Sequence, residues 1–418
     1  MNVTLRHVQI VDPAGPHHGQ TADIRIENGT ITAIGTGLDA PANEAVTFDN
    51  ACVSPGWFDS SVSFGEPGFE DRETIANGLH TAARSGFTAV ALQPNSYPVI
   101  DNQSQVRFVQ TQAHGSATRL YPIGALTKNS EGAELAELYD MQRAGAVAFG
   151  DYGKSLDNAN LLKTALQYVQ DFDGRVIAFC QDAYLKGKGF VNEGIVATRL
   201  GMKGIPALAE ELQVARNLFL LEYTGGRLHL PTLSTARSVA LVREAKAKGL
   251  NVTCSVTVHH LVLTDEALDS FDTRYKVTPP LRTEADRKAL VEAVLDGTID
   301  MITSDHNPLD IELKKLEFDL AKSGTIGLES AFGALLNVLP VDVIVAKLVD
   351  GRNAFGLPRP TVAVGAQAEL TLFTTKGERV FSATDILSKS KNAIFLNQLM
   401  KGRVYGVYAQ QKLVINGH

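Results

Sequence analysis

Residues 59–68 read Asp59-Ser60-Ser61-Val62-Ser63-Phe64-Gly65-Glu66-Pro67-Gly68 and directly follow an apolar, strand-like run over residues 51–58. Residues two apart at the end of a strand point to the same side, so Ser61 and Ser63 are predicted to face one space together. Two ligands at this spacing clamp a metal ion, but a neutral serine hydroxyl is a far poorer zinc ligand than imidazole, thiolate or carboxylate. The stretch therefore indicates the frame of a metal site in which the strong ligands are missing.

Outward from this stretch, short apolar runs rich in β-branched residues alternate with longer segments of helical period. This is the pattern of βα units around a parallel sheet. We predict strands over residues 52–58, 87–93, 119–123, 146–149, 175–180, 227–230, 251–256 and 299–303. We predict helices over residues 73–85, 158–170, 205–224, 235–248 and 284–295, with Thr235 and Thr283 as N-caps. Functional residues of such a barrel stand at the carboxyl ends of its strands.

The two ends of the chain have a different pattern. Residues 22–26 and 30–34 alternate like the strands of a hairpin around Glu27-Asn28-Gly29, an Asn-Gly turn signal. Residues 368–373, 404–407 and 412–415 read as antiparallel strands beyond a proline-rich break at residues 356–360. We therefore predict an α/β chain: a (β/α)8 TIM-like barrel over residues 51–355, and a small β-sandwich domain made from residues 1–50 and 356–418.

Composition excludes several classes of partner. The 418 residues carry a net charge of -7, with no long basic run, so electrostatics give no reason to expect nucleic acid or an anionic membrane. The first residues lack the apolar core of a signal peptide, and no apolar stretch approaches the length of a membrane span. Cys52, Cys180 and Cys254 lie in apolar runs, where reduced cysteine behaves as a small hydrophobe. We expect a cytoplasmic protein without disulfides.

Several motifs occur in a fixed order along nearly the whole chain: Glu66-Pro67-Gly68-Phe69-Glu70, Gly86-Phe87-Thr88, Pro94-Asn95, Asn192-Glu193-Gly194, Pro279-Pro280-Leu281-Arg282, Asp296-Gly297-Thr298-Ile299-Asp300 and Ser304-Asp305-His306. In these motifs the chain resembles the bacterial class I dihydroorotases of the amidohydrolase superfamily. The resemblance implies a barrel enzyme of pyrimidine synthesis that forms and hydrolyses the cyclic imide dihydroorotate on one or two zinc ions.

The resemblance also implies where the histidine ligands of zinc would stand. The His-x-His pair of the family falls on Ser61 and Ser63, its strand-five histidine on Phe179, and its strand-six histidine on Thr232. All of these histidines are replaced in this chain. We therefore expect no bound metal and no other cofactor.

Some acidic and substrate-binding positions are kept. Asp151 stands in the strand-four turn of the family's acidic ligand, and Asp305 matches the strand-eight aspartate, which binds metal and carries the proton. Asn95 matches a substrate-binding asparagine, and His259 is a further candidate for substrate contact. The arginine that pairs with the substrate carboxylate falls on Gly65, which has no side-chain donor to offer.

The expected function follows from these losses. Zinc makes a hydroxide nucleophile available at neutral pH, and without it that nucleophile must come from elsewhere. Asp305 alone could serve as a general base, which typically contributes only about 10²–10⁴-fold. We expect a catalytically inactive dihydroorotase homologue, a pseudoenzyme that forms homo-oligomers and is a structural or regulatory partner of aspartate transcarbamoylase, the enzyme with which the resemblance associates it.

Two alternatives stay open. The first is an active dihydroorotase, or a related cyclic amidohydrolase, with a rebuilt zinc site that draws on Asp59, Asp151, Asp182, Asp305 or His259. The second is a binding module whose barrel mouth holds a small ligand through Asn95, Thr232, His259 and Asp305.

The candidate side chains also have structural interpretations. Asp305 suits a position where its carboxylate accepts backbone hydrogen bonds in the loop that follows. Asp151 suits a turn position before Gly153. One of His259 and His260 is expected to be a core histidine with satisfied hydrogen bonds.

The remaining candidates at strands five and six have structural interpretations too. Phe179 beside Thr232 is expected to fill the space of metal and imidazoles. With Phe179 facing inward, strand alternation turns Cys180 away from the lumen. Lys186 is expected to be a solvated loop charge.

Overall fold

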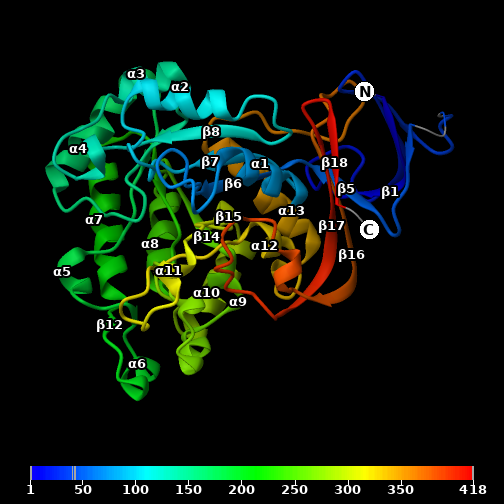
Figure 1. Ribbon diagram of the computed structural model, residues 1–418. Helices are drawn as coiled ribbons and strands as arrows, with labels where there is room; N and C mark the ends of the chain where they lie inside the picture. The colour runs from blue at the N-terminus through cyan, green and yellow to red at the C-terminus, as the bar shows by residue number, and fades with distance from the viewer. Residues whose placement is uncertain (1, 40, 42–43, 417–418) are drawn as a thin grey trace.

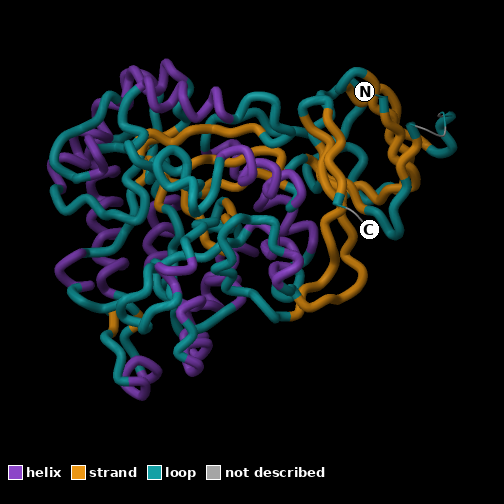
Figure 2. Tube along the Cα trace, in the orientation of Figure 1, coloured by secondary structure: helices purple, strands orange, loops and turns teal. Residues whose placement is uncertain are grey.

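The computed structural model describes residues 2–39, 41 and 44–416 (Figure 1). A barrel ringed by helices forms the larger part of the molecule, and a sheet that contains both ends of the chain lies at one side of it (Figure 2). No helix among the described residues combines the length and the apolar character that crossing a lipid bilayer requires.

Eight parallel strands form the barrel, and each pairs with the next along the chain. They are β6 (Trp57–Val62), β7 (Phe87–Leu92), β8 (Arg119–Gly124), β9 (Ala148–Phe149), β10 (Val176–Ile177), β13 (Leu228–Leu230), β14 (Val252–Thr257) and β15 (Met301–Thr303). The ring closes where Val62 forms a parallel bridge with His306, and the Ser63 amide donates to the His306 carbonyl at 2.7 Å. The predicted (β/α)8 fold is confirmed.

Helices cover the outside of the barrel (Figure 1). The longer ones are α1 (Ile75–Arg84), α2 (Gln103–Gln112), α3 (Leu138–Ala144), α4 (Ala159–Tyr168), α7 (Leu208–Thr224), α8 (Ala236–Ala247), α10 (Glu284–Leu295), α12 (Leu328–Leu335) and α13 (Val341–Val349). The Thr235 and Thr283 hydroxyls accept hydrogen bonds from the amides of Ser238 and Asp286, so both predicted N-caps are confirmed.

Shorter elements lie in the connections between these units. They are the helices α5 (Ala183–Lys186), α6 (Ile195–Leu200), α9 (Val258–Val262), α11 (Ile311–Lys314) and α14 (Gly351–Ala354), and the strand pair β11 (Val191–Asn192) and β12 (Gly204–Ile205).

The two ends of the chain form one further sheet, which we call the terminal sheet. Its order is β18 (Lys412–Ile415), β17 (Leu399–Ala409), β16 (Leu370–Val380), β5 (Cys52–Pro55), β1 (Val3–Ile10), β2 (Thr21–Glu27) and β3 (Thr30–Gly35), with β4 (Ala45–Val46) beside β1. Residues from both ends share its core, among them Leu5, Ile24, Val53 and Leu372.

The run predicted as one strand over residues 52–58 is divided. Its first half is β5 of the terminal sheet, and its second half begins β6 of the barrel. Gly56 separates them and lies against Thr88, where an added Cβ would be 2.1 Å from the threonine Oγ1. The backbone passes too close to β7 at this point for any side chain.

A buried carboxylate joins the first and last strands of the barrel. Asp59 of β6 accepts hydrogen bonds from the Thr303 hydroxyl, from the Ser304 amide at 2.9 Å, and from the Ser61 amide at 3.0 Å. The side chain is fully buried, so the Ser61 and Ser304 amides depend on it for a partner, whereas the Thr303 hydroxyl also reaches the Ser61 carbonyl at 3.4 Å.

We predict that Asp59→Ala lowers the free energy of unfolding by about 3 kcal/mol, because buried donors across the closing strands would lose their acceptor. Asp59→Asn keeps the shape and one acceptor oxygen, and is expected to lose only about 1 kcal/mol. Urea unfolding followed by circular dichroism measures both values. Wild-type stability of the alanine variant would mean that backbone pairing alone closes the barrel.

Candidate functional site

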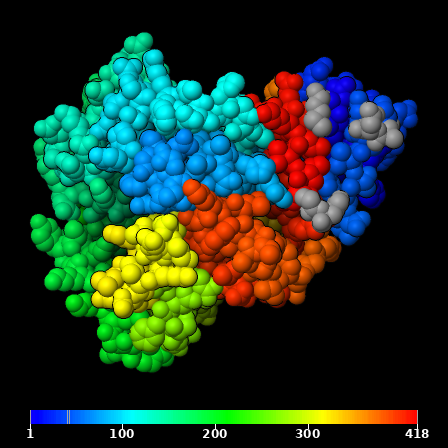
Figure 3. All heavy atoms as spheres, viewed as in Figure 1, coloured from blue at the N-terminus to red at the C-terminus, as the bar shows by residue number. Residues whose placement is uncertain are grey.

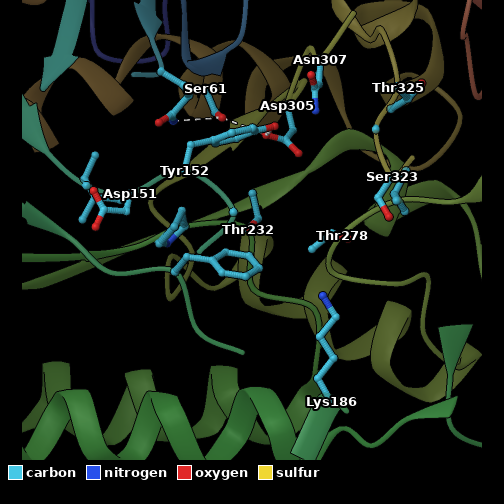
Figure 4. A pocket seen from close by; sticks show the side chains of 18 residues that line it. Ser61, Asp151, Tyr152, Lys186, Thr232, Thr278, Asp305, Asn307, Ser323 and Thr325 are labelled. Carbon is cyan, nitrogen blue, oxygen red and sulfur yellow. Dashed lines mark hydrogen bonds between the residues drawn. The ribbon is translucent and has the colours of Figure 1, made fainter. Parts of the chain in front are cut away.

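The carboxyl ends of the barrel strands enclose a cavity of about 220 Å³ (Figure 4). Most of the predicted ligand positions line it: Ser61, Asp151, Phe179, Thr232 and Asp305. Further polar lining comes from Gln93, Tyr152, Lys186, Thr278, Asn307, Ser323 and Thr325. The topology therefore brings together Ser61 and Asp305, which are 244 positions apart in sequence.

Asp305 is held by two hydroxyl groups. Ser61 Oγ donates to Asp305 Oδ1 at 2.9 Å, and Tyr152 Oη donates to the same oxygen at 3.0 Å (Figure 4). Gln93 Nε2 donates in turn to Ser61 Oγ at 3.1 Å. One oxygen of the carboxylate is thus occupied by groups of the protein itself.

Burial sets the charge preferences of this cluster. It raises the pKa of the Asp305 carboxyl to about 6, although the hydrogen bonds from Ser61 and Tyr152 pull the value down. Burial, followed by the negative charge of Asp305, raises the pKa of the Tyr152 phenol well above its ordinary value. Tyr152 therefore keeps its proton at neutral pH and stays a donor to Asp305.

Asp151 is engaged by the loop that follows β8. Its Oδ1 accepts from the amides of Leu126 and Thr127 at 3.0 and 3.2 Å, and its Oδ2 accepts from the Thr127 hydroxyl at 2.5 Å. Burial still raises the pKa of this carboxyl. Both oxygens fix the turn between β8 and the next helix.

Strands β10 and β13 give the cavity a largely apolar wall. Phe179 and Ile177 line it from the fifth strand unit, and Thr232 from the sixth. The Thr232 amide donates to Ser255 Oγ at 3.1 Å, which holds the residue at a left-handed φ of 52°. His229, nearer the start of β13, contacts Thr253 and Ser255 instead, and burial lowers its pKa to about 3.

This donor set does not fit zinc. Tetrahedral zinc sites use imidazole, thiolate and carboxylate groups, three or four to an ion. The cavity offers hydroxyls, a phenyl ring and two carboxylates that already accept hydrogen bonds from neighbours. Within the part of the chain that the structure describes, no three His, Cys, Asp or Glu side chains are grouped so that they could hold a metal ion.

Three of the predicted site residues do not line the cavity. Ser63 Oγ donates to Asn95 Oδ1 at 2.9 Å, so these two side chains bind each other. His259 is buried in α9, and its Nε2 has no hydrogen-bond partner among the described residues. Its neighbour His260 is the satisfied core histidine, with Thr257 Oγ1 at 2.7 Å and the Pro280 carbonyl at 3.1 Å.

Tyr152 and Lys186 are two of the lining residues that the sequence does not predict to serve the site. Tyr152 directly follows Asp151 in the strand-four turn, and this adjacency in sequence could have indicated that Tyr152 also lies at the cavity. Lys186 was expected to be a solvated loop charge, but it lines the cavity from α5, and burial lowers its pKa. Cys180 is turned away, as predicted: it accepts a hydrogen bond from Asn217 of α7, and burial raises its thiol pKa to about 12.

The chain is similar to known proteins in sequence and in fold. The family described as dihydro-orotase-like matches residues 50–238. A dihydroorotase of Pelotomaculum thermopropionicum is 40% identical over 422 residues, which cover 99% of each chain. A dihydroorotase of Acetivibrio thermocellus is 38% identical and covers 97% of each.

The fold recurs in more distant solved structures. The L-hydantoinase (dihydropyrimidinase) of Arthrobacter aurescens superposes with a TM-score of 0.87 over 99% of this chain and 96% of its own, at 21% identity. That likeness supports the barrel with its terminal sheet. With 40% identity to a dihydroorotase along almost the entire length, the chain belongs to the dihydroorotase family.

Proposed function

We propose that this chain is a catalytically inactive member of the dihydroorotase family and acts in the cytoplasm as a structural or regulatory partner in pyrimidine synthesis. The observation that carries the proposal is the state of Asp305. The resemblance makes it the proton carrier of the reaction, yet its Oδ1 is occupied by Ser61 and Tyr152, and none of the described residues that line the cavity is a histidine.

The chemistry of imide hydrolysis supports this proposal. A metal ion lowers the pKa of bound water from 15.7 to about 7 and polarises the carbonyl under attack. The side chains at Ser61, Phe179 and Thr232 cannot supply either effect. A lone Asp305 offers base catalysis of about 10²–10⁴-fold, far below the acceleration that enzymes commonly reach.

We predict that the purified chain binds less than about one zinc ion in ten molecules and forms no dihydroorotate from carbamoyl aspartate, because a donor set of hydroxyls and engaged carboxylates binds zinc weakly. Elemental analysis and the cyclisation assay, run on one sample after zinc addition, give both values. The 38% identical Acetivibrio enzyme is the matched control. Stoichiometric zinc with turnover would establish the alternative, an active cyclic amidohydrolase with a rebuilt site.

A restored ligand set makes the same experiment more discriminating. The variant that combines Ser61→His, Ser63→His, Phe179→His and Thr232→His returns imidazoles to the positions implied by the resemblance. It should bind zinc where the parent does not. If it folds like the parent but stays free of zinc, these positions are not the lost ligand positions, and the proposal loses its main support.

The charge state of Asp305 gives a pH-dependent prediction. Its pKa of about 6 in the folded protein lies above the ordinary value, so the folded state binds this proton more tightly than the unfolded chain. The ionised form therefore destabilises the fold, by an amount that grows as the pH rises from about 4 to 6 and is constant above. Asp305→Asn should raise the free energy of unfolding by about 2 kcal/mol at pH 8 and by almost nothing near pH 4.

Urea unfolding of the two proteins at both pH values measures this difference. An equal difference at pH 4 and pH 8 would show that ionisation of Asp305 does not limit stability.

The proposed partner is aspartate transcarbamoylase, with which the resemblance associates this family. Co-expressed with the transcarbamoylase of the same organism, the chain should elute with it from a size-exclusion column at a fixed ratio, since a partner role requires a stable complex. The separately purified proteins, mixed at the same concentrations, test whether the complex re-forms. Elution of the two as separate peaks in both experiments would contradict the assembly role.

A further inference from the structure

A cavity of about 380 Å³ lies at the end of the barrel opposite to the mouth. We call it the floor cavity. Residues at the amino ends of the barrel strands line it together with residues of α13 and α14. Its polar lining includes Arg175, Asn251, Thr253, Asp300, Lys347 and Asn353. Barrels carry their catalytic residues at the carboxyl ends of the strands, so this cavity lies outside that region.

An apolar layer separates the floor cavity from the mouth. Arg175, Ile177 and Phe179 are two residues apart along the fifth strand unit and therefore face the same side. Arg175 lines the floor cavity and Phe179 lines the mouth. Ile177 between them belongs to a buried apolar cluster with Phe58 and Phe355. The two cavities have no described lining residue in common, so they are separate places in the barrel.

Arg175 is a buried cation at the floor cavity. Only 7% of the residue is exposed, and its Nη1 has no hydrogen-bond partner among the described residues. A guanidinium carries five N–H donors in a planar fork that matches the oxygens of a carboxylate or a phosphate. Because a buried charge is costly unless it is paired, this side chain indicates a place prepared for an anion.

The carboxylates whose charge acts on Arg175 are paired with other cations. Asp300 accepts hydrogen bonds from Lys246 Nζ at 2.7 Å through each of its oxygens. Asp173 pairs with Arg227 at 2.6 Å. Both attract Arg175 electrostatically, and neither forms an ion pair with it in the described part of the chain. The donors of Arg175 therefore stay available to a ligand.

A second cation lines the floor cavity. Lys347 of α13 donates a hydrogen bond to the Ile299 carbonyl at 2.5 Å and pairs with no carboxylate of the residues described. An ammonium group has three donors, so two of them remain. Asp350, which also lines the cavity, is paired with Arg359 at 2.8 Å. The cavity thus presents two positive charges that are free to meet an anion.

The charge of Arg175 acts on the groups around it. Burial, followed by the positive charges of Arg175 and Lys246, lowers the pKa of His229 to about 3. Burial, followed by the positive charge of Arg227, lowers the pKa of Arg175 itself to about 10. Arg175 therefore stays charged at neutral pH, and His229 stays neutral.

We propose that the floor cavity binds a small metabolite through an oxyanion, a phosphate or carboxylate group, with Arg175 as the anchor and Lys347 as the second cation. The volume of about 380 Å³ lies in the range of small-molecule sites. An anion bound there offsets the cost of burying Arg175. This inference goes beyond the proposed function, because it concerns the other end of the barrel and makes no use of the mouth.

Thermal unfolding of the full chain tests the proposal. The probes are sodium phosphate and sodium acetate at neutral pH, each compared with sodium chloride at the same ionic strength. A ligand that binds only the folded state raises the unfolding temperature. At a concentration about twenty times its Kd, the anion should raise the Tm by about 2 °C in a chain of this size. A shift with phosphate identifies a phosphate group, and a shift with acetate alone identifies a carboxylate.

Substitutions locate the binding site. Arg175→Met should abolish the shift, and without the anion it should unfold at no lower temperature than the parent, because it removes an unpaired buried charge. Arg227→Met is the matched control, since this neighbouring guanidinium pairs with Asp173 and does not line the floor cavity. It should keep the shift. Lys186→Met removes the lysine of the mouth and should keep the shift as well.

A second variant leaves Arg175 in place. Ala346 of α13 lines the floor cavity, and Ala346→Glu adds a carboxylate there that competes with the anion, so the shift should disappear. Circular dichroism shows whether each variant folds. The proposal is overturned if neither anion shifts the parent, or if the shift survives in a folded Arg175→Met or Ala346→Glu variant. Loss of the shift in Arg227→Met or Lys186→Met would overturn it too, by placing the binding elsewhere.

Discussion

The closure of the barrel between β6 and β15 is the constraint on which both fold and site depend. Asp59 ties the two strands together through Thr303 and Ser304, and the backbone pairing of Val62 with His306 continues the same line. Ser61 and Asp305 directly precede Val62 and His306 on these two segments, and Ser61 donates a hydrogen bond to Asp305. The hydrogen bonds of Asp59 that close the ring are therefore adjacent to the Ser61–Asp305 hydrogen bond at the barrel mouth. A substitution that disturbs one of them is expected to disturb the other.

The barrel mouth satisfies its own polar groups. Carboxylates removed from water need partners, and here Asp305 finds them in Ser61 and Tyr152, and Asp151 in Thr127 and two amides. Phe179 adds apolar volume where the resemblance expects an imidazole. These side chains are compatible with one another. The phenyl ring of Phe179 has no donor or acceptor to leave unpaired, and the hydroxyls of Ser61 and Tyr152 donate to Asp305. Asp305 and Asp151 are therefore both paired with groups of the protein itself.

Much of this could be predicted from sequence, and the misses have physical causes. The barrel strands follow from local apolar runs, and the caps Thr235 and Thr283 from short-range hydrogen bonding, so both are visible in a few neighbouring residues. The division at Gly56 is not visible in neighbouring residues, because β5 and β6 together form one apolar run. The two strands differ in their pairing partners, which for β5 are β1 and β16. Lys186 and Tyr152 reach the cavity through long side chains, whose direction depends on elements far away in sequence. For the same reason Asn95 and His259, both at strand ends, point elsewhere.

The strand order of the terminal sheet has a consequence for folding of the chain during its synthesis on the ribosome. β5 lies between β1 and β16, so its second edge stays open until residues near 370 have been made, although the barrel strands are complete by residue 303. An unpaired strand edge is a template for association with other chains. Roughly the last eighth of the sequence is therefore needed to cover this edge. A polypeptide released before it is made would carry a complete set of barrel strands beside an unpaired strand edge.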